Sequence, residues 1–254
     1  MILVIDVGNS STKIGVFQKD IIIAKWRITT IHQHTEDEYA SKVLPLLNFL
    51  NIDLMGFKGA VISSVVNGVT NPIAIFIEKY FKITPLIANE IQHDLILKID
   101  NPKKLGSDIL ANAIATNRLY KETCIFIDFG TALVIGVITK EKELLGVTIS
   151  PGMQTSYDSL INKTDLLPYV QLSSHNLKQT LGKNTEDAIK LGIYSSYIET
   201  VNGIVKKIYK EHGVKLKTII TGEFAEIIYK QIISVDIYEP NLTLEGLKFL
   251  YNFN

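Results

Sequence analysis

The chain opens with short apolar runs separated by polar turns, a pattern that is typical of β-strands. These runs predict a meander of antiparallel strands at residues 2–7, 12–18 and 21–27. Apolar positions then recur at helical spacing from Thr35 to Leu50, where Thr35 and Glu38 have the spacing of a capping box. The remainder of this half predicts a strand and two helices, at residues 59–64, 72–81 and 107–120.

The second half repeats this order of elements. A second strand meander is predicted at residues 124–128, 133–139 and 143–148. Further helices are predicted at residues 153–162, 185–212, 224–230 and from Thr243 onward, and further strands at residues 217–221 and 234–238. Because no low-complexity linker separates the halves, we expect two packed lobes, residues 1–117 and 118–254.

Each meander begins with a similar turn, in which an apolar strand ends in Asp-x-Gly and small polar residues follow. The first turn runs from Asp6 to Lys13, and the second from Asp128 to Thr131. Glycine lets the backbone approach an anion closely, successive N–H groups can bind phosphate oxygens, and a lysine adds positive charge. A single copy could be an ordinary Gly-Asn hairpin with a solvated aspartate. The recurrence favours two phosphate-binding turns.

Composition excludes several classes of protein. The formal net charge is zero, so nothing favours binding to nucleic acid or to an anionic membrane surface. No uninterrupted apolar stretch approaches the roughly 20 residues that cross a bilayer, and Asp6 interrupts the N-terminal run, which reads as a strand and not as a signal peptide. Cys124 is the sole cysteine and cannot form an intramolecular disulfide. We therefore expect a cytoplasmic protein.

The paired turns resemble the phosphate loops of the actin, sugar kinase and Hsp70 ATPase superfamily, in which ATP lies between two lobes. Further motifs are similar to those of type III pantothenate kinases: Lys104–Asp108 with Asn112 and Ala113, Ser150–Gly152, Gly182–Thr185, Thr221-Gly222 and Pro240–Leu247. The resemblance covers nearly the whole chain. It implies a duplicated ribonuclease H-like α/β fold, with a mixed β-sheet flanked by helices in each lobe, and a homodimer. The implied activity is ATP-dependent phosphorylation of pantothenate to 4′-phosphopantothenate, the first step of coenzyme A biosynthesis.

The resemblance also implies roles for individual residues. Asp108 would be the general base that accepts the proton of the substrate hydroxyl, and Asp128 would bind a monovalent cation, K⁺ or NH₄⁺. Mg²⁺ would accompany ATP. The residues implied to bind ATP are Asp6, Val7, Gly8, Asn9, Ser10, Ser11, Thr12, Lys13 and Thr131. The residues implied to bind pantothenate are Ile99, Gly106, Ser107, Asp108, Ile109 and Thr185, the last from a dimer interface. From the residues alone, Ser107 or Asp108 could instead be an N-cap.

Several positions depart from the family pattern. Ile109 stands where an arginine is usual and Ile99 where a tyrosine is usual, and Gly136 ends a stretch that usually has two threonines and an aspartate. Glu223 replaces the second glycine of a usual Thr-Gly-Gly. Loss of the arginine removes a possible contact with the pantothenate carboxylate, which is worth roughly 1.5–3 kcal/mol. The alternatives are a different hydroxylated acceptor, a nucleotide-binding regulatory protein without turnover, or an actin-like filament protein.

Overall fold

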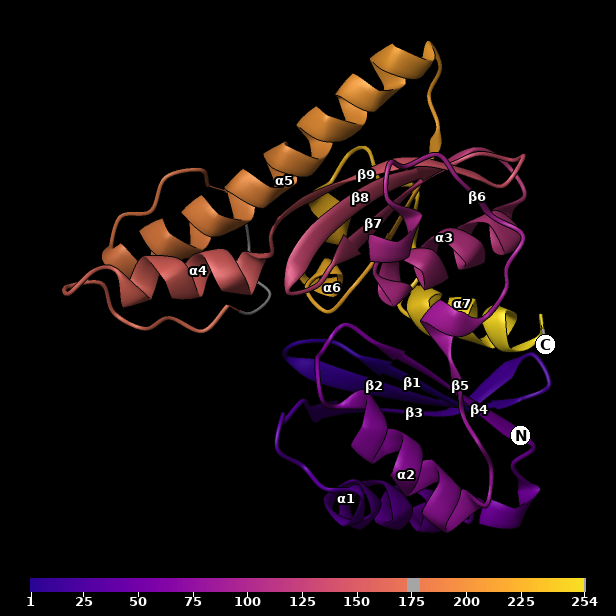
Figure 1. The fold of residues 1–254 in the computed structure, drawn as a ribbon. Coiled ribbons are helices and arrows are strands. Elements are labelled where there is room, and N and C mark those ends of the chain that lie inside the picture. The colour runs from indigo at the N-terminus through magenta and orange to yellow at the C-terminus, as the bar shows by residue number, and fades with distance from the viewer. Residues whose placement is uncertain (173–178, 254) are drawn as a thin grey trace. The chain divides into compact units, whose positions relative to one another are not determined.

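The computed structural model describes residues 1–172 and 179–253, which form two compact units (Figure 1). Unit 1 comprises Met1–Leu95, Asp100–Ala115 and Asn241–Asn254. Unit 2 comprises Ile96–Ile99 and Thr116–Pro240. Within the described residues, no helix is long and apolar enough to span a membrane.

Unit 1 contains a five-stranded sheet in the order β3-β2-β1-β4-β5. The strands are β1 Ile2–Val7, β2 Ser11–Gln18, β3 Ile21–Thr29, β4 Gly59–Ser64 and β5 Leu86–Ile87. β1, β2 and β3 form the predicted antiparallel meander, whereas β4 is parallel to β1 and β5 is parallel to β4. Alternate residues such as Ile5 and Val7 point to one face of the sheet, where they pack in the core formed with α1 (Glu36–Phe49) and α2 (Thr70–Phe81).

Helix α7 (Leu242–Tyr251) packs against β1, β2 and β4 on the opposite face. It also crosses α3 (Ser107–Tyr120) closely, because a Cβ on Gly246 would lie 1.9 Å from the carbonyl oxygen of Ala111. The compact units differ from the predicted lobes, residues 1–117 and 118–254, in that α7 belongs to unit 1. This segment returns to unit 1, where its leucines, including Leu244, are buried.

Unit 2 contains a six-stranded sheet in the order β11-β10-β7-β8-β9-β6. Its strands are β6 Ile96–Leu97, β7 Cys124–Phe129, β8 Ala132–Ile138, β9 Glu143–Pro151, β10 Lys217–Thr221 and β11 Ile237–Tyr238. Its helices are α4 Met153–Asn162, α5 Thr185–His212 and α6 Ala225–Ile228. On one face, Ile125, Ile127 and Phe129 of β7 pack with Tyr194 and Val201 of the long helix α5.

The two sheets repeat one topology. β7, β8 and β9 form an antiparallel meander as β1, β2 and β3 do, and β10 is parallel to β7 as β4 is to β1. In each meander the register shifts once between the second and third strands. The predicted duplicated ribonuclease H-like α/β fold, with a mixed sheet and helices in each half, is therefore confirmed.

The longer elements follow the predicted pattern and the short ones depart from it. The capping box at Thr35 is present, since Thr35 N–H donates to Glu38 Oε2 at 2.8 Å and Glu38 N–H donates to Thr35 Oγ1 at 3.4 Å. The predicted helix at 224–230 is divided into α6 and a 3₁₀ turn. The unpredicted short elements are β5, β6 and the 3₁₀ turns Leu54–Gly56, Ala88–Glu90 and Pro102–Lys104.

Candidate active site

The carboxylate at the end of β1 lies in a row of polar side chains that crosses the sheet of unit 1. In the strand register, Asp6 pairs with Lys13 on β2 and Ser63 on β4, and Lys13 pairs with Arg27 on β3. Residues paired in this way point to the same face of a sheet. Asp6 is 6% exposed and accepts a 2.9 Å hydrogen bond from the Ser63 hydroxyl at Oδ1. Asp6 is therefore not the solvated aspartate of an ordinary hairpin.

The turn between β1 and β2 has a fixed backbone shape. Gly8 N–H donates to the carbonyl oxygen of Ser11 at 3.0 Å. The Thr30 hydroxyl donates to the Gly8 carbonyl at 2.8 Å, and Thr30 N–H donates to the Ser10 carbonyl at 3.2 Å. Asn9 and Ser10 are exposed at the tip. The turn thus presents ordered polar backbone to solvent, as a phosphate loop requires.

Two side chains of the predicted ATP-binding stretch belong to the core. Val7 is fully buried in the cluster with α1 and α2. Thr12 pairs with Val7 and points to the same face, where its hydroxyl lies 2.9 Å from the Thr30 hydroxyl. The side chains of Val7 and Thr12 are therefore unavailable to a ligand, whereas the backbone of the turn and the exposed side chains of Asn9 and Ser10 remain accessible.

Ser63 connects the first loop to the helix that carries the candidate base. Ser63 Oγ lies 2.9 Å from Asp6 Oδ1 and 2.8 Å from Ser107 Oγ, and all three residues are buried. The Ser63 hydroxyl is positioned to donate to Asp6 Oδ1 or to Ser107 Oγ, and because it has a single proton it donates to one of them at a time. This chain links the end of β1 to the first residue of α3.

Asp108 is the second residue of α3 and is partly exposed. Its Oδ1 accepts a 2.8 Å hydrogen bond from Ile109 N–H. A Cβ on Gly106 would lie 2.5 Å from that oxygen, so a side chain there would displace the carboxylate. Because the helix begins at Ser107, Asp108 lies within the first turn and not at the cap position. The side chain of Ile109 is buried, at 7% exposure.

The second loop follows β7 and is held by two glycine turns of unit 2. The carbonyl oxygen of Thr131 accepts hydrogen bonds from Gly152 N–H at 2.8 Å and from the Thr155 hydroxyl at 2.7 Å. A Cβ on Gly152 would lie 2.1 Å from the Gly130 carbonyl oxygen. Gly222 has φ +103°, and a Cβ there would lie 2.4 Å from the backbone nitrogen of Phe129, the last residue of β7. These contacts explain the glycines of the Ser-Pro-Gly and Thr-Gly motifs.

Asp128 occupies in unit 2 the position that Asp6 occupies in unit 1. It pairs with Val134 on β8 and with Thr221 on β10, so the three side chains share one face. Thr221 is 1% exposed, and its hydroxyl has no hydrogen-bond partner in the structure. A carboxylate beside a hydroxyl offers the oxygen ligands that hard cations prefer. Asp128 and Thr221 are thus residues that could hold a cation.

The remaining predicted substrate-binding residues are divided between the units. Gly106–Ile109 belong to unit 1, whereas Ile99 and Thr185 belong to unit 2. Ile99 follows β6, and Thr185 is the exposed first residue of α5, which Asn184 caps by accepting from Asp187 N–H. Within unit 1, the hydrogen bonds from Asp6 through Ser63 to Ser107 connect the first loop to the helix that carries the candidate base.

Gly136 has a packing role inside β8. It pairs with Phe126 of β7, and a Cβ at this glycine would lie 2.4 Å from the phenylalanine ring and 2.9 Å from Val147. Glycine at this position makes room for the ring. This departure from the family pattern thus has an explanation within the core of unit 2.

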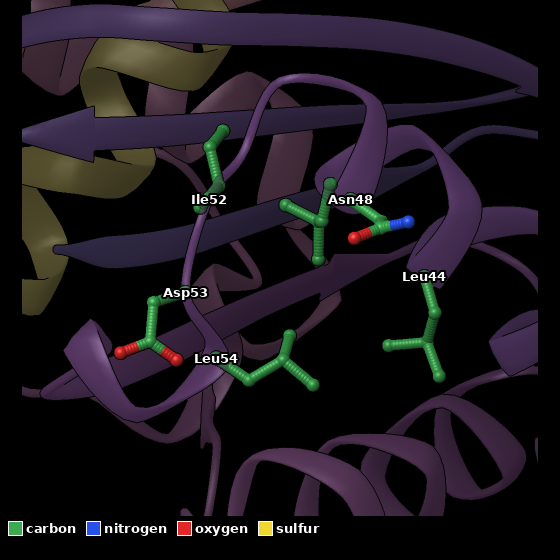
Figure 2. Close-up of a pocket in the computed structure, with 6 residues that line it drawn as sticks. Leu44, Asn48, Ile52, Asp53 and Leu54 are labelled. Carbon is green, nitrogen blue, oxygen red and sulfur yellow. The ribbon is translucent and has the colours of Figure 1, made fainter.

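A pocket of about 300 Å³ in unit 1 lies away from the first loop. Figure 2 shows side chains that line it: Leu44, Asn48, Ile52, Asp53 and Leu54. It lies between the end of α1 and the segment leading into β4, at the end of the sheet opposite the loop. Asp53 accepts a 3.0 Å hydrogen bond from Met55 N–H and so caps a 3₁₀ turn. We assign this pocket no part in catalysis.

In the part of the chain that the structure describes, no group of three or more histidine, cysteine, aspartate or glutamate side chains could hold a metal ion.

A sequence model of type III pantothenate kinases matches residues 2–207. This chain belongs to the type III pantothenate kinase family. It is 37% identical over 255 residues to a type III pantothenate kinase of Halalkalibacterium halodurans, with 100% of both chains covered. It is 38% identical over 255 residues to a type III pantothenate kinase of a Geobacillus species, with 100% of this chain and 98% of the relative covered.

Similarity to solved structures supports the same fold. A protein from Sinorhizobium meliloti described as a 2-dehydro-3-deoxygalactonokinase has a TM-score of 0.64, with 99% of this chain and 96% of that chain covered. At 10% identity this similarity shows the shared fold alone. The sequence comparisons thus give the family, and the structural comparison gives the fold.

Sequence reasoning did not assign roles to Ser63 or to the Thr221 hydroxyl in this pantothenate kinase family member. Each is a hydroxyl residue near the carboxyl end of a strand that is parallel to the strand of a loop aspartate. The predicted strands at 59–64 and 217–221 already contained that signal. Only the register shows that each hydroxyl lies opposite an aspartate.

Proposed function

We propose that this protein transfers the γ-phosphoryl group of ATP to pantothenate, giving 4′-phosphopantothenate, the first step of coenzyme A biosynthesis. Membership of the type III pantothenate kinase family along the chain carries this assignment. The buried chain from Asp6 through Ser63 to Ser107 supports it, because it joins the first phosphate loop to the helix that bears the candidate base.

ATP binds to both loops in this proposal. The turn at Gly8–Ser11 offers backbone N–H groups to phosphate oxygens, Lys13 adds a positive charge, and Thr131 contributes from the second loop. Phosphoryl transfer depends on placing the reactants in line and on neutralising the charge of the phosphate chain. Hydrogen bonds that fix the backbone of each loop support such preorganisation.

Asp108 acts as the general base and accepts the proton of the attacking pantothenate hydroxyl. Its carboxylate position is set by Ile109 N–H and by the space that Gly106 leaves. We assign pantothenate binding to Gly106, Ser107 and Ile109 of unit 1 and, following the family resemblance, to Ile99 and Thr185 of unit 2. The buried isoleucine at 109 offers no charge to the pantothenate carboxylate, so another group would have to bind it.

Two kinds of cation belong to the proposal. Kinases use ATP with a divalent metal, and we assign Mg²⁺ to the ATP phosphates. We assign a monovalent cation, K⁺ or NH₄⁺, to Asp128. The neighbouring Thr221 hydroxyl fits this assignment, because it is a buried oxygen without another partner. When bound, the monovalent cation would add positive charge beside the second phosphate loop.

We also propose a homodimer and a cytoplasmic location. The family resemblance supports the dimer. A single cysteine, buried at Cys124, supports a reducing compartment.

Asp108→Asn tests the role of Asp108 as the general base. Asp108→Asn should lower kcat by about 10²- to 10⁴-fold, the usual contribution of general-base catalysis, because an amide cannot accept the hydroxyl proton. ATP binding, measured by calorimetry, should survive, because Asp108 does not belong to either loop. Full activity in this variant would contradict the assignment of the base. Activity of the wild-type protein that is independent of K⁺ would contradict the cation assignment alone.

A further inference from the structure

The hydroxyl of Thr221 is buried without a partner, although the residue opposite Thr221 in the strand register is Asp128. It ends β10, is 1% exposed and makes no hydrogen bond in the structure. A buried hydroxyl that lacks a partner destabilises the folded protein, and such groups are rare in native structures. A ligand that binds at this point would satisfy the hydroxyl.

The duplication of the fold shows what is unusual about this position. In unit 1 the hydroxyl opposite the loop aspartate is Ser63, which binds Asp6 and faces Ser107 as well. In unit 2 the equivalent hydroxyl, Thr221, lies opposite Asp128 and has no hydrogen bond. The same sheet position is thus satisfied in one half and open in the other.

The charges next to the two aspartates differ in a corresponding way. On the antiparallel side, the residue paired with the unit 1 aspartate is Lys13, whereas the residue paired with Asp128 is Val134. At this register position unit 1 therefore has a positively charged lysine side chain, whereas unit 2 has an apolar valine side chain. A cation bound at Asp128 would be the counterpart in unit 2 of the Lys13 charge in unit 1.

We propose that the Thr221 hydroxyl oxygen is a ligand of the monovalent cation that binds at Asp128. This inference rests on the proposed role of Asp128 as a cation site. One carboxylate and one neutral oxygen balance a single positive charge, and both are hard oxygen ligands. Because Thr221 is buried, bulk water does not reach its hydroxyl oxygen and so does not compete with a cation for it.

Two valine substitutions on β10 separate ligation from a structural role. Thr221→Val removes the hydroxyl at nearly constant volume. Thr218→Val does the same on the opposite face of the strand, where the Thr218 hydroxyl lies 2.9 Å from the Tyr209 hydroxyl and is fully buried. Thr221→Ser keeps a hydroxyl at the site and serves as the conservative variant.

The full-length proteins would be titrated with KCl in the presence of Mg·ADP, with ionic strength held constant by tetramethylammonium chloride. The melting temperature gives both the K⁺-free stability and the K⁺ concentration at half-saturation. Thr221→Val should be as stable as wild type or more stable without K⁺, and should need on the order of 10-fold more K⁺. Thr218→Val should melt at a lower temperature with an unchanged K⁺ requirement, and Thr221→Ser should keep the K⁺ response.

The other possible results of the K⁺ titration distinguish failure of the Thr221 inference from failure of the proposed cation site. An unchanged K⁺ requirement in Thr221→Val overturns the inference, as does a loss of stability equal to that of Thr218→Val. If Asp128→Asn abolishes the K⁺ response while Thr221→Val keeps it, only the inference about Thr221 fails. If wild type and Asp128→Asn respond to K⁺ alike, the proposed cation site fails and the inference fails with it.

Discussion

The position of the Asp108 carboxylate depends on the smallest residue near it. Gly106 lies two residues before the candidate base, and a Cβ there would meet Asp108 Oδ1 at 2.5 Å. A carboxylate can rotate away from such a contact, but it then leaves the position from which it would accept the proton. The effect of a side chain at 106 should therefore appear in catalysis before it appears in stability.

Gly106→Ala should lower kcat by roughly 10- to 100-fold, the cost of misplacing a catalytic group by about 1 Å. Thermal unfolding should change little, because the displaced group is the end of a flexible side chain. Gly203→Ala is the matched control, since a Cβ at this exposed position of α5 meets nothing within 4 Å. That control should keep kcat and gain stability, because alanine favours a helix over glycine. Equal kcat in the two variants would contradict the assigned geometry.

Cys124 should be chemically silent in the folded protein. It is fully buried in β7, and burial raises the pKa of its thiol to about 12. The thiolate is the reactive form, so a disulfide reagent at pH 8 should label the protein only after unfolding in denaturant. The unfolded thiol ionises near pH 8.5, so the contribution of this site to stability falls as pH rises above that value. Rapid labelling of the native protein would contradict the buried position.

At the scale of elements, the crossing of α3 and α7 supports the helix that carries the base. Gly246 of α7 lies so close to α3 that an added Cβ would be 1.9 Å from the carbonyl oxygen of Ala111. The Thr243 hydroxyl also donates to Asn112 Oδ1 at 2.9 Å across the same contact. Backbone atoms, unlike the end of a side chain, cannot move away without shifting a helix.

Gly246→Ala should therefore destabilise the protein by about 1–3 kcal/mol or more, the range for overpacking a core. Urea unfolding at equilibrium measures this change, and kcat should fall as well because α3 is displaced. The Gly203→Ala protein is again the control for the helical preference of alanine. Unfolding free energies that agree between Gly246→Ala and wild type would show that the two helices are not in the described contact.

The elements that could be predicted are those whose own sequence carries the signal. Alternating apolar residues and the Thr35 capping box defined the long strands and α1. β5 and β6 have two residues each, too few for a periodic pattern, and arise from pairing with a neighbour. The return of α7 to unit 1 was not predictable either, because an apolar helix face does not specify which sheet it covers.

The candidate site was predictable to a similar extent. The loop aspartates and Asp108 stood in recognisable motifs, whereas the roles of Ser63 and Thr221 depend on strand register and on which hydroxyl finds a partner. Neither property can be read along a single strand. Conversely, Val7 and Thr12 belong to the first loop by sequence, but their side chains lie in the core.

At the scale of the whole molecule, one sheet topology occurs twice with different chemistry at equivalent positions. Each half has an aspartate at the end of its first meander strand and a hydroxyl residue opposite it on a parallel strand. In the first half a lysine pairs with the aspartate and a hydrogen-bonded chain leads to α3, whereas Val134 pairs with Asp128 in the second half. The halves are therefore specialised, and unit 1 holds the candidate base.

The most direct test of the proposed function is a kinase assay of the purified protein with Mg·ATP, pantothenate and a small panel of other hydroxylated acceptors, with and without K⁺. Mass spectrometry would identify the product. We predict ATP-dependent formation of 4′-phosphopantothenate that increases with K⁺ and exceeds the product from every other acceptor. Binding of ATP without phosphorylation of pantothenate, or clear preference for another acceptor, would contradict the account.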